Sequence, residues 1–323
     1  PDGRLLPRPA AVRQWSGRSG KSAAVGSQLA SIRRAPCLCG SVHGLSGWSV
    51  AKFSTFGREI KMLLAVDVGN TNIVFGIFEG EALSESWRLA TIHDRTADEL
   101  RVLVSRLFAE RGLDMQVVSG VVLSSVVPPL TATLTEMVKR AFGQGMLTID
   151  ATNAGLPVHY HPPEDVGSDR LVNGVAALAE CGGTGRAIIV VDFGTATTFD
   201  VISVAGEYVG GVICPGVEIS ADALFQKAAR LPRIDVRRPD SVIGMSTVMS
   251  IRSGLYFGYV AMVEGLVARL REELGGDQPA ISIATGGLAG TIAAETKAID
   301  HVRPDLTLQG LRLAWYRNLE PKR

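Results

Sequence analysis

The chain has 323 residues, a length that suits two domains sharing a cleft better than one compact domain. Its apolar fraction of 46% is ordinary for a globular protein and allows a sizeable core. The formal net charge of +1 indicates no nucleic-acid surface. No apolar run reaches the roughly 18–20 residues that a membrane-spanning helix needs. From the charge and from the absence of such a run, we expect neither nucleic acid nor a membrane as a partner.

The first 61 residues differ in composition from the rest of the chain. They contain ten of the 33 Lys and Arg residues but only two of the 32 Asp and Glu residues, which leaves the remainder mildly acidic. They are rich in Arg, Ser and Gly and show no sustained helical or strand period. Two interpretations stay open: translated sequence or a remnant ahead of the true start, or an organelle transit peptide of the same composition. Under either one we expect this leader to lie outside the fold and to be poorly ordered.

The four cysteines form neither a disulfide framework nor a metal-binding pattern. Cys37 and Cys39 lie in the basic leader, and Cys181 and Cys214 lie far apart in the body. This usage favours a reducing compartment, so we expect a cytoplasmic protein. We interpret Cys181 and Cys214 as core residues rather than nucleophiles.

From Met62 onward the apolar pattern predicts a first α/β half, which we assign to residues 62–180. Apolar runs and turn residues predict strands at 62–68, 73–78, 82–89 and 117–123. Thr96 and Glu99 form a capping box at the start of a helix, and Gly112 ends it. Pro128-Pro129 opens the next helix, where a missing N–H costs nothing. The first half therefore has the order strand, strand, strand, helix, strand, helix.

The second half, assigned to residues 181–323, begins in a similar order. Its strands are expected at 186–192, 197–204, 207–213 and 280–284, and its helices at about 216–230 and 246–274. The similarity is one of architecture rather than of close sequence. We expect two similar α/β halves that face each other, with the ligand in the crevice off the strand ends.

A short turn occurs once in each half, directly after a buried strand. The two copies are Asp67-Val68-Gly69-Asn70-Thr71 and Asp192-Phe193-Gly194-Thr195-Ala196-Thr197. The Asp projects a carboxylate that can hold magnesium, its waters or a monovalent cation. The Gly allows close approach of the backbone to phosphate oxygens, and the Asn or Thr offers neutral donors. A single such turn is most simply a strand-ending turn, but two copies in equivalent positions indicate a clamp on a triphosphate.

A third glycine-rich segment, Ala284 to Gly290, lies between a predicted strand and a helix. Its pair Gly286-Gly287 leaves open backbone against which adenine or ribose can pack. The chain has no GxxxxGK[ST] segment and no basic side chain in either phosphate turn, so it is not a P-loop protein. Together the three segments resemble the pattern of the actin, sugar kinase and heat-shock ATPase superfamily.

Within that superfamily, residues 62 to about 319 resemble the type III pantothenate kinase family. The resemblance rests on five stretches in matching order: the two phosphate turns, Pro163 to Arg170, Pro215 to Ser220 with Leu231-Pro232, and Ser246 to Gly254. It implies two ribonuclease H-like α/β halves around a nucleotide cleft, the actin-like ATPase fold. It also implies transfer of the γ-phosphate of ATP to pantothenate, the first step of coenzyme A biosynthesis, with Mg²⁺ and K⁺ or NH₄⁺ as cofactors.

The resemblance assigns roles position by position. Asp169 matches the catalytic base, Asp192 the ligand of a monovalent cation, and Asp67 the residue that orients magnesium through water. ATP contacts are implied for Asp67, Val68, Gly69, Asn70, Thr71, Asn72, Ile73, Val74, Thr195, Gly286 and Gly287. Contacts to pantothenate are implied for Tyr160, Gly167, Ser168, Asp169, Arg170 and Thr247. Because the family's acceptor pocket lies at a dimer interface, we expect a homodimer.

Several features leave room for other interpretations. Ser168 stands where the family usually has Ala, which affects only the local hydrogen bonding of Asp169. Asp169 and Arg170 alone could be a helix start beside a surface arginine, and the His159-Tyr160-His161 run alone could suggest a metal, although it lacks a third ligand nearby. Two rival functions also remain: a kinase of the same superfamily with another acceptor, and a non-catalytic nucleotide-binding accessory protein. The presence of Asp67, Asp169 and Asp192 argues against the second rival.

Overall fold

The computed structural model describes residues 62–227 and 234–320. The first of its two five-stranded sheets has the strand order β3-β2-β1-β4-β5. Strand β1 pairs antiparallel with β2 and parallel with β4, and β2 pairs antiparallel with β3. The strands of this sheet are β1 (Met62–Val68), β2 (Asn72–Glu79), β3 (Ala82–Ala90), β4 (Val118–Ser125) and β5 (Leu147–Thr148).

The second sheet repeats this arrangement with the order β10-β9-β6-β7-β8. Strand β6 pairs antiparallel with β7 and parallel with β9, as β1 does with β2 and β4. The strands of this sheet are β6 (Ile188–Phe193), β7 (Ala196–Ile202), β8 (Tyr208–Pro215), β9 (Ile281–Gly286) and β10 (His301–Val302). The expected duplication of an α/β half is therefore confirmed, and β1 and β6 are the equivalent strands that lead into the two phosphate turns.

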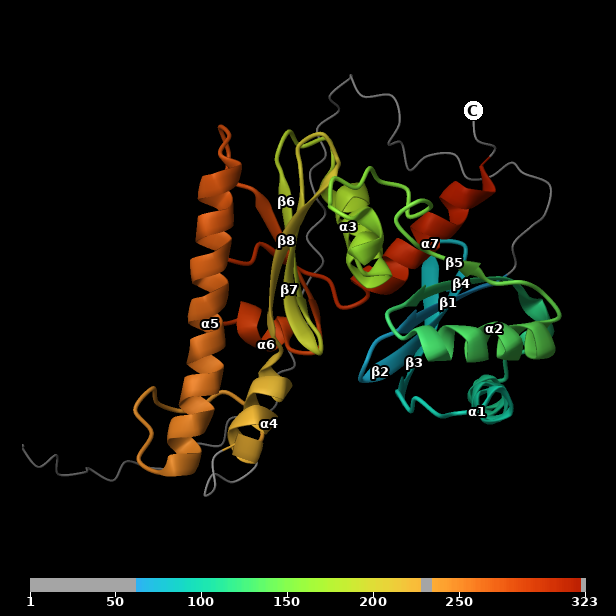
Figure 1. The fold of residues 1–323 in the computed structure, drawn as a ribbon, viewed down its shortest axis with the longest axis horizontal. Helices are drawn as coiled ribbons and strands as arrows, with labels where there is room; N and C mark the ends of the chain where they lie inside the picture. Colours follow the sequence, from blue (N-terminus) through green and yellow to red (C-terminus); the bar gives the residue numbers. More distant parts are fainter. Residues whose placement is uncertain (1–61, 228–233, 321–323) are drawn as a thin grey trace, which may run out of the picture. The chain divides into compact units, whose positions relative to one another are not determined.

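Helices cover both faces of each sheet. Helices α1 (Ala97–Glu110) and α2 (Pro128–Phe142) pack on each other over the first sheet, and α5 (Thr247–Leu274) and α6 (Ala289–Ala293) cover the outer face of the second (Figure 1). Helices α3 (Ser168–Cys181) and α7 (Leu306–Leu319) pack together between the sheets: α3 contacts β4, β6 and β7, and α7 contacts β1 and β4. The remaining helical segments are α4 (Val217–Lys227) and the 3₁₀ turns Met115–Val117 and Pro163–Asp165.

The buried strands explain why their sequences are nearly continuous apolar runs. In β1, Leu63 and Ala65 belong to the central core with α3 and α7, whereas Leu64 and Val66 belong to the outer core with α1 and α2. All four side chains have no exposed area. Alternate side chains of one strand thus enter two different cores, as is usual for strands buried on both faces.

Several elements differ from the sequence-based expectations. The capping box of Thr96 and Glu99 is present, and the predicted strands and helices occur with shifts of a few residues at their ends. The helix expected after Gly286-Gly287 is α6, whereas the sequence pattern did not reveal α3, α7 or the short strands β5 and β10. The end of the helix expected at about 216–230, the Leu231-Pro232 turn and the leader 1–61 lie outside the described residues.

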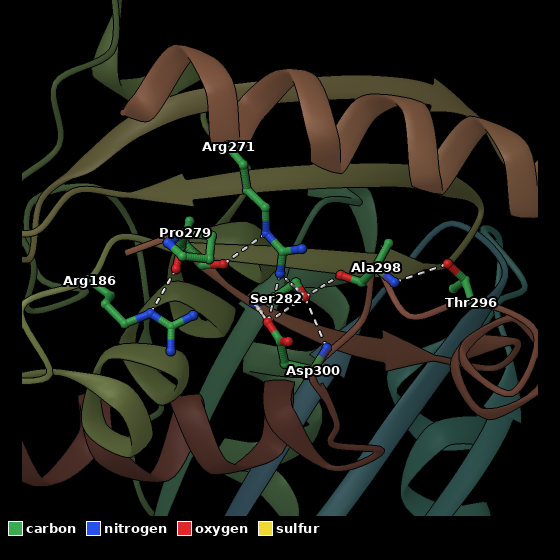
Figure 2. Close-up of polar contacts among 8 residues, drawn as sticks. Arg186, Arg271, Pro279, Ser282, Thr296, Ala298 and Asp300 are labelled. Atoms are coloured by element: carbon green, nitrogen blue, oxygen red, sulfur yellow. Dashed lines mark hydrogen bonds and ion pairs between the residues drawn. The ribbon is translucent and has the colours of Figure 1, made fainter. Parts of the chain in front are cut away.

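A polar cluster holds the end of α5 against the start of β9 (Figure 2). Arg271 donates from Nε to the carbonyl of Ala280 at 3.0 Å and from Nη2 to Asp300 Oδ2 at 2.8 Å. The same carboxylate oxygen accepts from the backbone N–H of Ser282 at 2.8 Å, and the Ser282 side chain is fully buried. Buried polar groups are stable only with such partners. The cluster therefore fixes the strand whose other end reaches the glycine pair.

No helix among residues 62–227 and 234–320 combines the length and the apolar character that crossing a membrane requires.

Candidate active site

A cleft of about 640 Å³ opens where the two phosphate turns meet the start of α3 and the end of β9. Its lining comes from both halves, which agrees with the expected crevice at the strand ends. The lining includes most of the site residues predicted from the sequence. These are Asp67, Gly69, Asn70, Thr71, Asn72, Val74, Gly167, Asp169, Arg170, Asp192, Thr195, Gly286 and Gly287. The tertiary structure thus gathers in one place most of the residues that the sequence separates by up to 220 positions.

The two phosphate turns contact each other across the cleft. Thr71 Oγ1 lies 2.8 Å from Thr195 Oγ1, although the two residues are 124 positions apart. Each turn is closed by its own glycine amide: Gly69 N–H donates to Asn72 O at 2.9 Å, and Gly194 N–H donates to Ala196 O at 3.1 Å. Both hydroxyls and the open backbone around them offer neutral donors to anionic oxygens. The paired turns are therefore suited to hold a phosphate chain from two sides.

The glycine pair at the end of β9 closes a third side of the cleft. Gly286 has a φ of +89°, and a Cβ atom at this position would lie 2.6 Å from both Asp192 Oδ1 and Phe193 O. Only glycine accepts this backbone conformation together with this close approach. At Gly287 a Cβ atom would meet nothing within 4 Å, so the second glycine leaves open space on the cleft side.

Three aspartates converge in the cleft, and the pKa of each is raised. Burial raises the pKa of Asp67 to about 8, and the charges of Asp169 and Asp192 add to the effect. Burial also raises the pKa of Asp192 to about 7, again with a contribution from Asp169. The pKa of Asp169 is raised as well, mainly by its burial. Like charges gathered without a cation have this effect, and a bound cation reverses it.

The acidic cluster of Asp67, Asp169 and Asp192 is suited to bind a hard cation that takes its other ligands from water or phosphate oxygens. Asp67 Oδ1 is buried and has no hydrogen-bond partner within the described part of the chain. Carboxylate oxygens with water and phosphate oxygens form the ligand set that magnesium prefers. Among the described residues no group of three or more His, Cys, Asp or Glu could hold a metal ion alone. A magnesium ion here would therefore complete its shell with water and nucleotide oxygens.

The start of α3 places Asp169 at the cleft. Gly167 is the N-cap of the helix, and the Arg170 N–H donates to Asp169 Oδ1 at 2.8 Å. Ser168 does not line the cleft: its Oγ is buried, accepts from Ser125 N–H at 2.9 Å and lies 3.1 Å from Ser124 Oγ. The hydroxyl at this position thus anchors the helix start to β4.

Two further polar partners of the site were missed in the sequence. Asn173, on α3, donates from Nδ2 to Asp192 Oδ2 at 3.0 Å and accepts from Thr307 Oγ1 at 2.8 Å. Asp200, on β7, accepts from Arg170 Nε at 2.6 Å. Both have no exposed area. The sequence does contain a signal for both residues, because each is a polar residue within an apolar stretch. Such a residue indicates a buried polar group that needs a hydrogen-bond partner.

Besides Ser168, four of the expected site residues lie outside the cleft lining. Val68 and Ile73 are core residues beneath the first phosphate turn, with at most 1% exposure. Tyr160 packs edge-on against Tyr208, with 6.3 Å between the ring centroids. Thr247 is exposed at the first residue of α5. Within the described chain, Tyr160 and Thr247 are therefore not brought to the cleft formed by the three aspartates.

The model of the family "Type III pantothenate kinase" matches residues 63–269. The type III pantothenate kinases of Moorella thermoacetica and Myxococcus xanthus are each 50% identical over 258 residues, which cover 80% of this chain and 100% and 99% of those proteins. A solved structure from Campylobacter jejuni, named for the Baf family of transcriptional activators, superposes with a TM-score of 0.50 at 18% identity. The superposition covers 79% of this chain and 98% of the Campylobacter jejuni chain.

The duplicated sheets and the cleft between their phosphate turns define a protein of the actin-like ATPase and sugar kinase fold. The structural match at 18% identity supports the fold alone. The family match and the extent of identity establish the narrower assignment: the chain belongs to the type III pantothenate kinase family.

Proposed function

We propose that this chain transfers the γ-phosphate of ATP to the hydroxyl of pantothenate, giving 4'-phosphopantothenate in the first step of coenzyme A biosynthesis. The observation that carries the proposal is the convergence of Asp67, Asp169 and Asp192 in a cleft formed by two paired phosphate turns. Membership of a kinase family supports ATP and a divalent metal as the other components. The protein is proposed to act in the cytoplasm.

Asp169 is proposed as the general base. The hydroxyl oxygen of the acceptor attacks the γ-phosphorus, its O–H bond breaks, and the proton passes to the Asp169 carboxylate. The bond between the γ-phosphorus and the β,γ-bridging oxygen breaks, and ADP leaves. The burial that raises the pKa of Asp169 makes it a stronger base than an exposed carboxylate, provided that it is ionised when the acceptor binds.

The nucleotide is proposed to lie along the first phosphate turn, residues 67–74, with Thr195 and the Gly286-Gly287 pair on the facing side. The neutral hydroxyls of Thr71 and Thr195 donate to phosphate oxygens from both sides. Asp67 would hold magnesium through water, and Asp192 would hold a monovalent cation. These ions, when bound, neutralise phosphate charge as it develops during transfer. Val68 and Ile73 support the turn from the core rather than by contact through their side chains.

The acceptor is proposed to bind at the start of α3. Gly167 and Arg170 line the cleft beside Asp169, and a guanidinium is well suited to the carboxylate of pantothenate. Ser168 contributes by anchoring this helix start to β4. Tyr160 is expected to contact the acceptor from the segment that precedes α3.

Thr247 is proposed to reach the acceptor of a second copy of the chain in a homodimer. Its surroundings support an interface, because large apolar side chains are exposed on β8, on α4 and in the segment before α5. These are Ile213, Ile219, Leu224, Phe225, Val242, Ile243 and Met245. An exposed group of this kind is typical of a protein contact. In the dimer, Thr247 of the partner subunit would complete the acceptor pocket.

The test is an ATP-consumption assay on the full chain with magnesium and potassium. Pantothenate is compared with a panel of sugars and small carboxylic acids. Turnover with pantothenate alone supports the proposal. Turnover with another acceptor would keep the nucleotide site and overturn the assignment of the acceptor. ATP binding without turnover of any acceptor would favour the non-catalytic alternative.

A further inference from the structure

The guanidinium of Arg170 is held by a buried polar network in the second half of the chain. Its Nε donates to Asp200 Oδ1 at 2.6 Å, and the carboxylate of Asp200 is fully buried. The Tyr208 hydroxyl donates to the same oxygen at 2.8 Å, and Thr198 Oγ1 donates to Oδ2 at 2.9 Å. Arg170 also lies over the ring of Tyr208, 5.7 Å from its centroid. Three side chains from β7 and β8 thus fix one orientation of this arginine.

This network is not explained by stability. A buried ion pair loses the hydration of both partners, and apolar residues of similar size often stabilise a core equally well. Another arginine, Arg271 in the second half, makes its ion pair with Asp300 at a more exposed position that ties α5 to β9. The Arg170–Asp200 pair instead lies beside the cleft, next to Asp169. Its position indicates a role in the site.

The geometry leaves part of the guanidinium for a ligand. Among the described residues, Asp200 is the only side chain that accepts a hydrogen bond from the guanidinium of Arg170, and it does so at Nε. The two Nη groups form the other edge of the planar fork, the edge that commonly binds carboxylates with two parallel hydrogen bonds. Fixing Nε to a buried carboxylate sets the plane of this fork before any acceptor arrives.

Tyr208 connects the same network to a second expected acceptor contact. The backbone of Tyr208 donates to Pro157 O and accepts from His159 N–H, both at 2.8 Å, so the preceding segment is paired to β8. Tyr160 follows directly and packs against the Tyr208 ring. One tyrosine therefore touches the arginine, its counter-ion and the segment that carries Tyr160.

We propose that Asp200 and Tyr208 are positioning residues that preset Arg170 for an acceptor carboxylate and so make the enzyme select anionic over neutral acceptors. The inference rests on the proposed function and extends it to residues that do not touch the acceptor. Preorganised donors bind a charged group at a lower entropic cost than donors that must be ordered on binding.

The experiment compares two acceptors of nearly the same shape. Pantothenate carries the carboxylate, and pantothenol has a neutral alcohol in its place. The variants Asp200→Asn and Tyr208→Phe are made in the full chain, and KM and kcat are measured for both acceptors. We expect Asp200→Asn to raise the KM for pantothenate about tenfold, with kcat and the KM for pantothenol changed by less than about threefold. Tyr208→Phe keeps the ring and should show a smaller shift of the same kind.

Asp300→Asn is the matched control, because it removes the carboxylate of another Asp–Arg pair in the same half. It should change neither acceptor's KM. Equal losses of kcat/KM for both acceptors in Asp200→Asn and Tyr208→Phe would overturn the proposal and leave the network a purely structural role. Unchanged kinetics in both variants would overturn it as well. If Asp200→Asn does not fold, Tyr208→Phe decides by the same comparison. A wild-type chain that uses neither acceptor would refute the proposed function itself, and the inference with it.

Discussion

Asp67→Asn tests whether the acidic cluster destabilises the free protein. Asp67 is half-buried in the cleft, and its buried Oδ1 has no hydrogen-bond partner among the described residues. Asparagine has nearly the same shape and carries no charge. We expect the variant to be inactive as a kinase and yet more stable than the wild type at neutral and alkaline pH, because it removes a carboxylate whose ionised form is disfavoured.

The magnitude follows from the pKa. The pKa of Asp67 rises from 3.8 to about 8 in the folded chain, so the folded state binds the proton more tightly than the unfolded state. The contribution of the Asp67 carboxyl to the free energy of unfolding has its full value below pH 3.8. It is lost as pH rises towards 8, at about 1.4 kcal/mol per pH unit. Between pH 5 and pH 8 the loss amounts to about 3–4 kcal/mol in the free energy of unfolding. The Asp67→Asn variant should not show this loss of stability, because asparagine does not titrate.

The measurement is denaturant unfolding of wild type and variant at pH 5, 6, 7 and 8 without nucleotide. The difference in unfolding free energy should grow in favour of Asp67→Asn as pH rises. Asp277→Asn serves as the control, since Asp277 is exposed, and its curve should run parallel to that of the wild type. Parallel curves for Asp67→Asn as well would refute the reasoning that burial and like charge raise the pKa of this carboxyl.

Further predictions concern the base, the cation, the glycine pair and the α5 cluster. Asp169→Asn should lower kcat by at least about 10²-fold while ATP still binds by calorimetry; equal loss of both would remove its role as base. Asp192→Ala should abolish activation by K⁺ or NH₄⁺ in steady-state assays, and a wild type indifferent to these ions would contradict the assignment. Gly286→Ala should weaken ATP binding at least tenfold because its Cβ meets Asp192 and Phe193, whereas Gly287→Ala, whose Cβ meets no protein atom, should fold without strain and lose less ATP affinity. Arg271→Ala should cost about 1–3 kcal/mol of stability in urea melts and leave both KM values unchanged; altered kinetics would show that the cluster affects the cleft.

The strands and phosphate turns could be predicted because their signals are local. The run from Met62 to Val68 is apolar because both faces of the strand are buried, and Gly69 follows it directly in the turn. The capping box of Thr96 and Glu99 is likewise made within four residues. The resemblance of these stretches and their order to one kinase family was sufficient to identify the family.

Helix α3 could not be predicted by the same means. It lies between the two sheets, and most of its side chains from Ser168 to Cys181 are buried. Its apolar residues follow one face as clearly as those of α2, so the apolar pattern was available. The helix that carries Asp169, Arg170 and Asn173 lacks a start signal instead, because its N-cap Gly167 offers no capping side chain, whereas α1 begins with a capping box and α2 with prolines.

The sequence by itself determined which residue types are present for phosphate transfer: a carboxylate at each of two equivalent strand ends, glycine in each turn and an Asp-Arg pair. Only the tertiary structure decided how they meet. The contact of Thr71 with Thr195, the effect of Asp169 on the pKa of Asp67 and Asp192, and the pairing of Arg170 with Asp200 all join residues distant in sequence. Such contacts depend on how two sheets pack around shared helices, and no local pattern of residues encodes that packing.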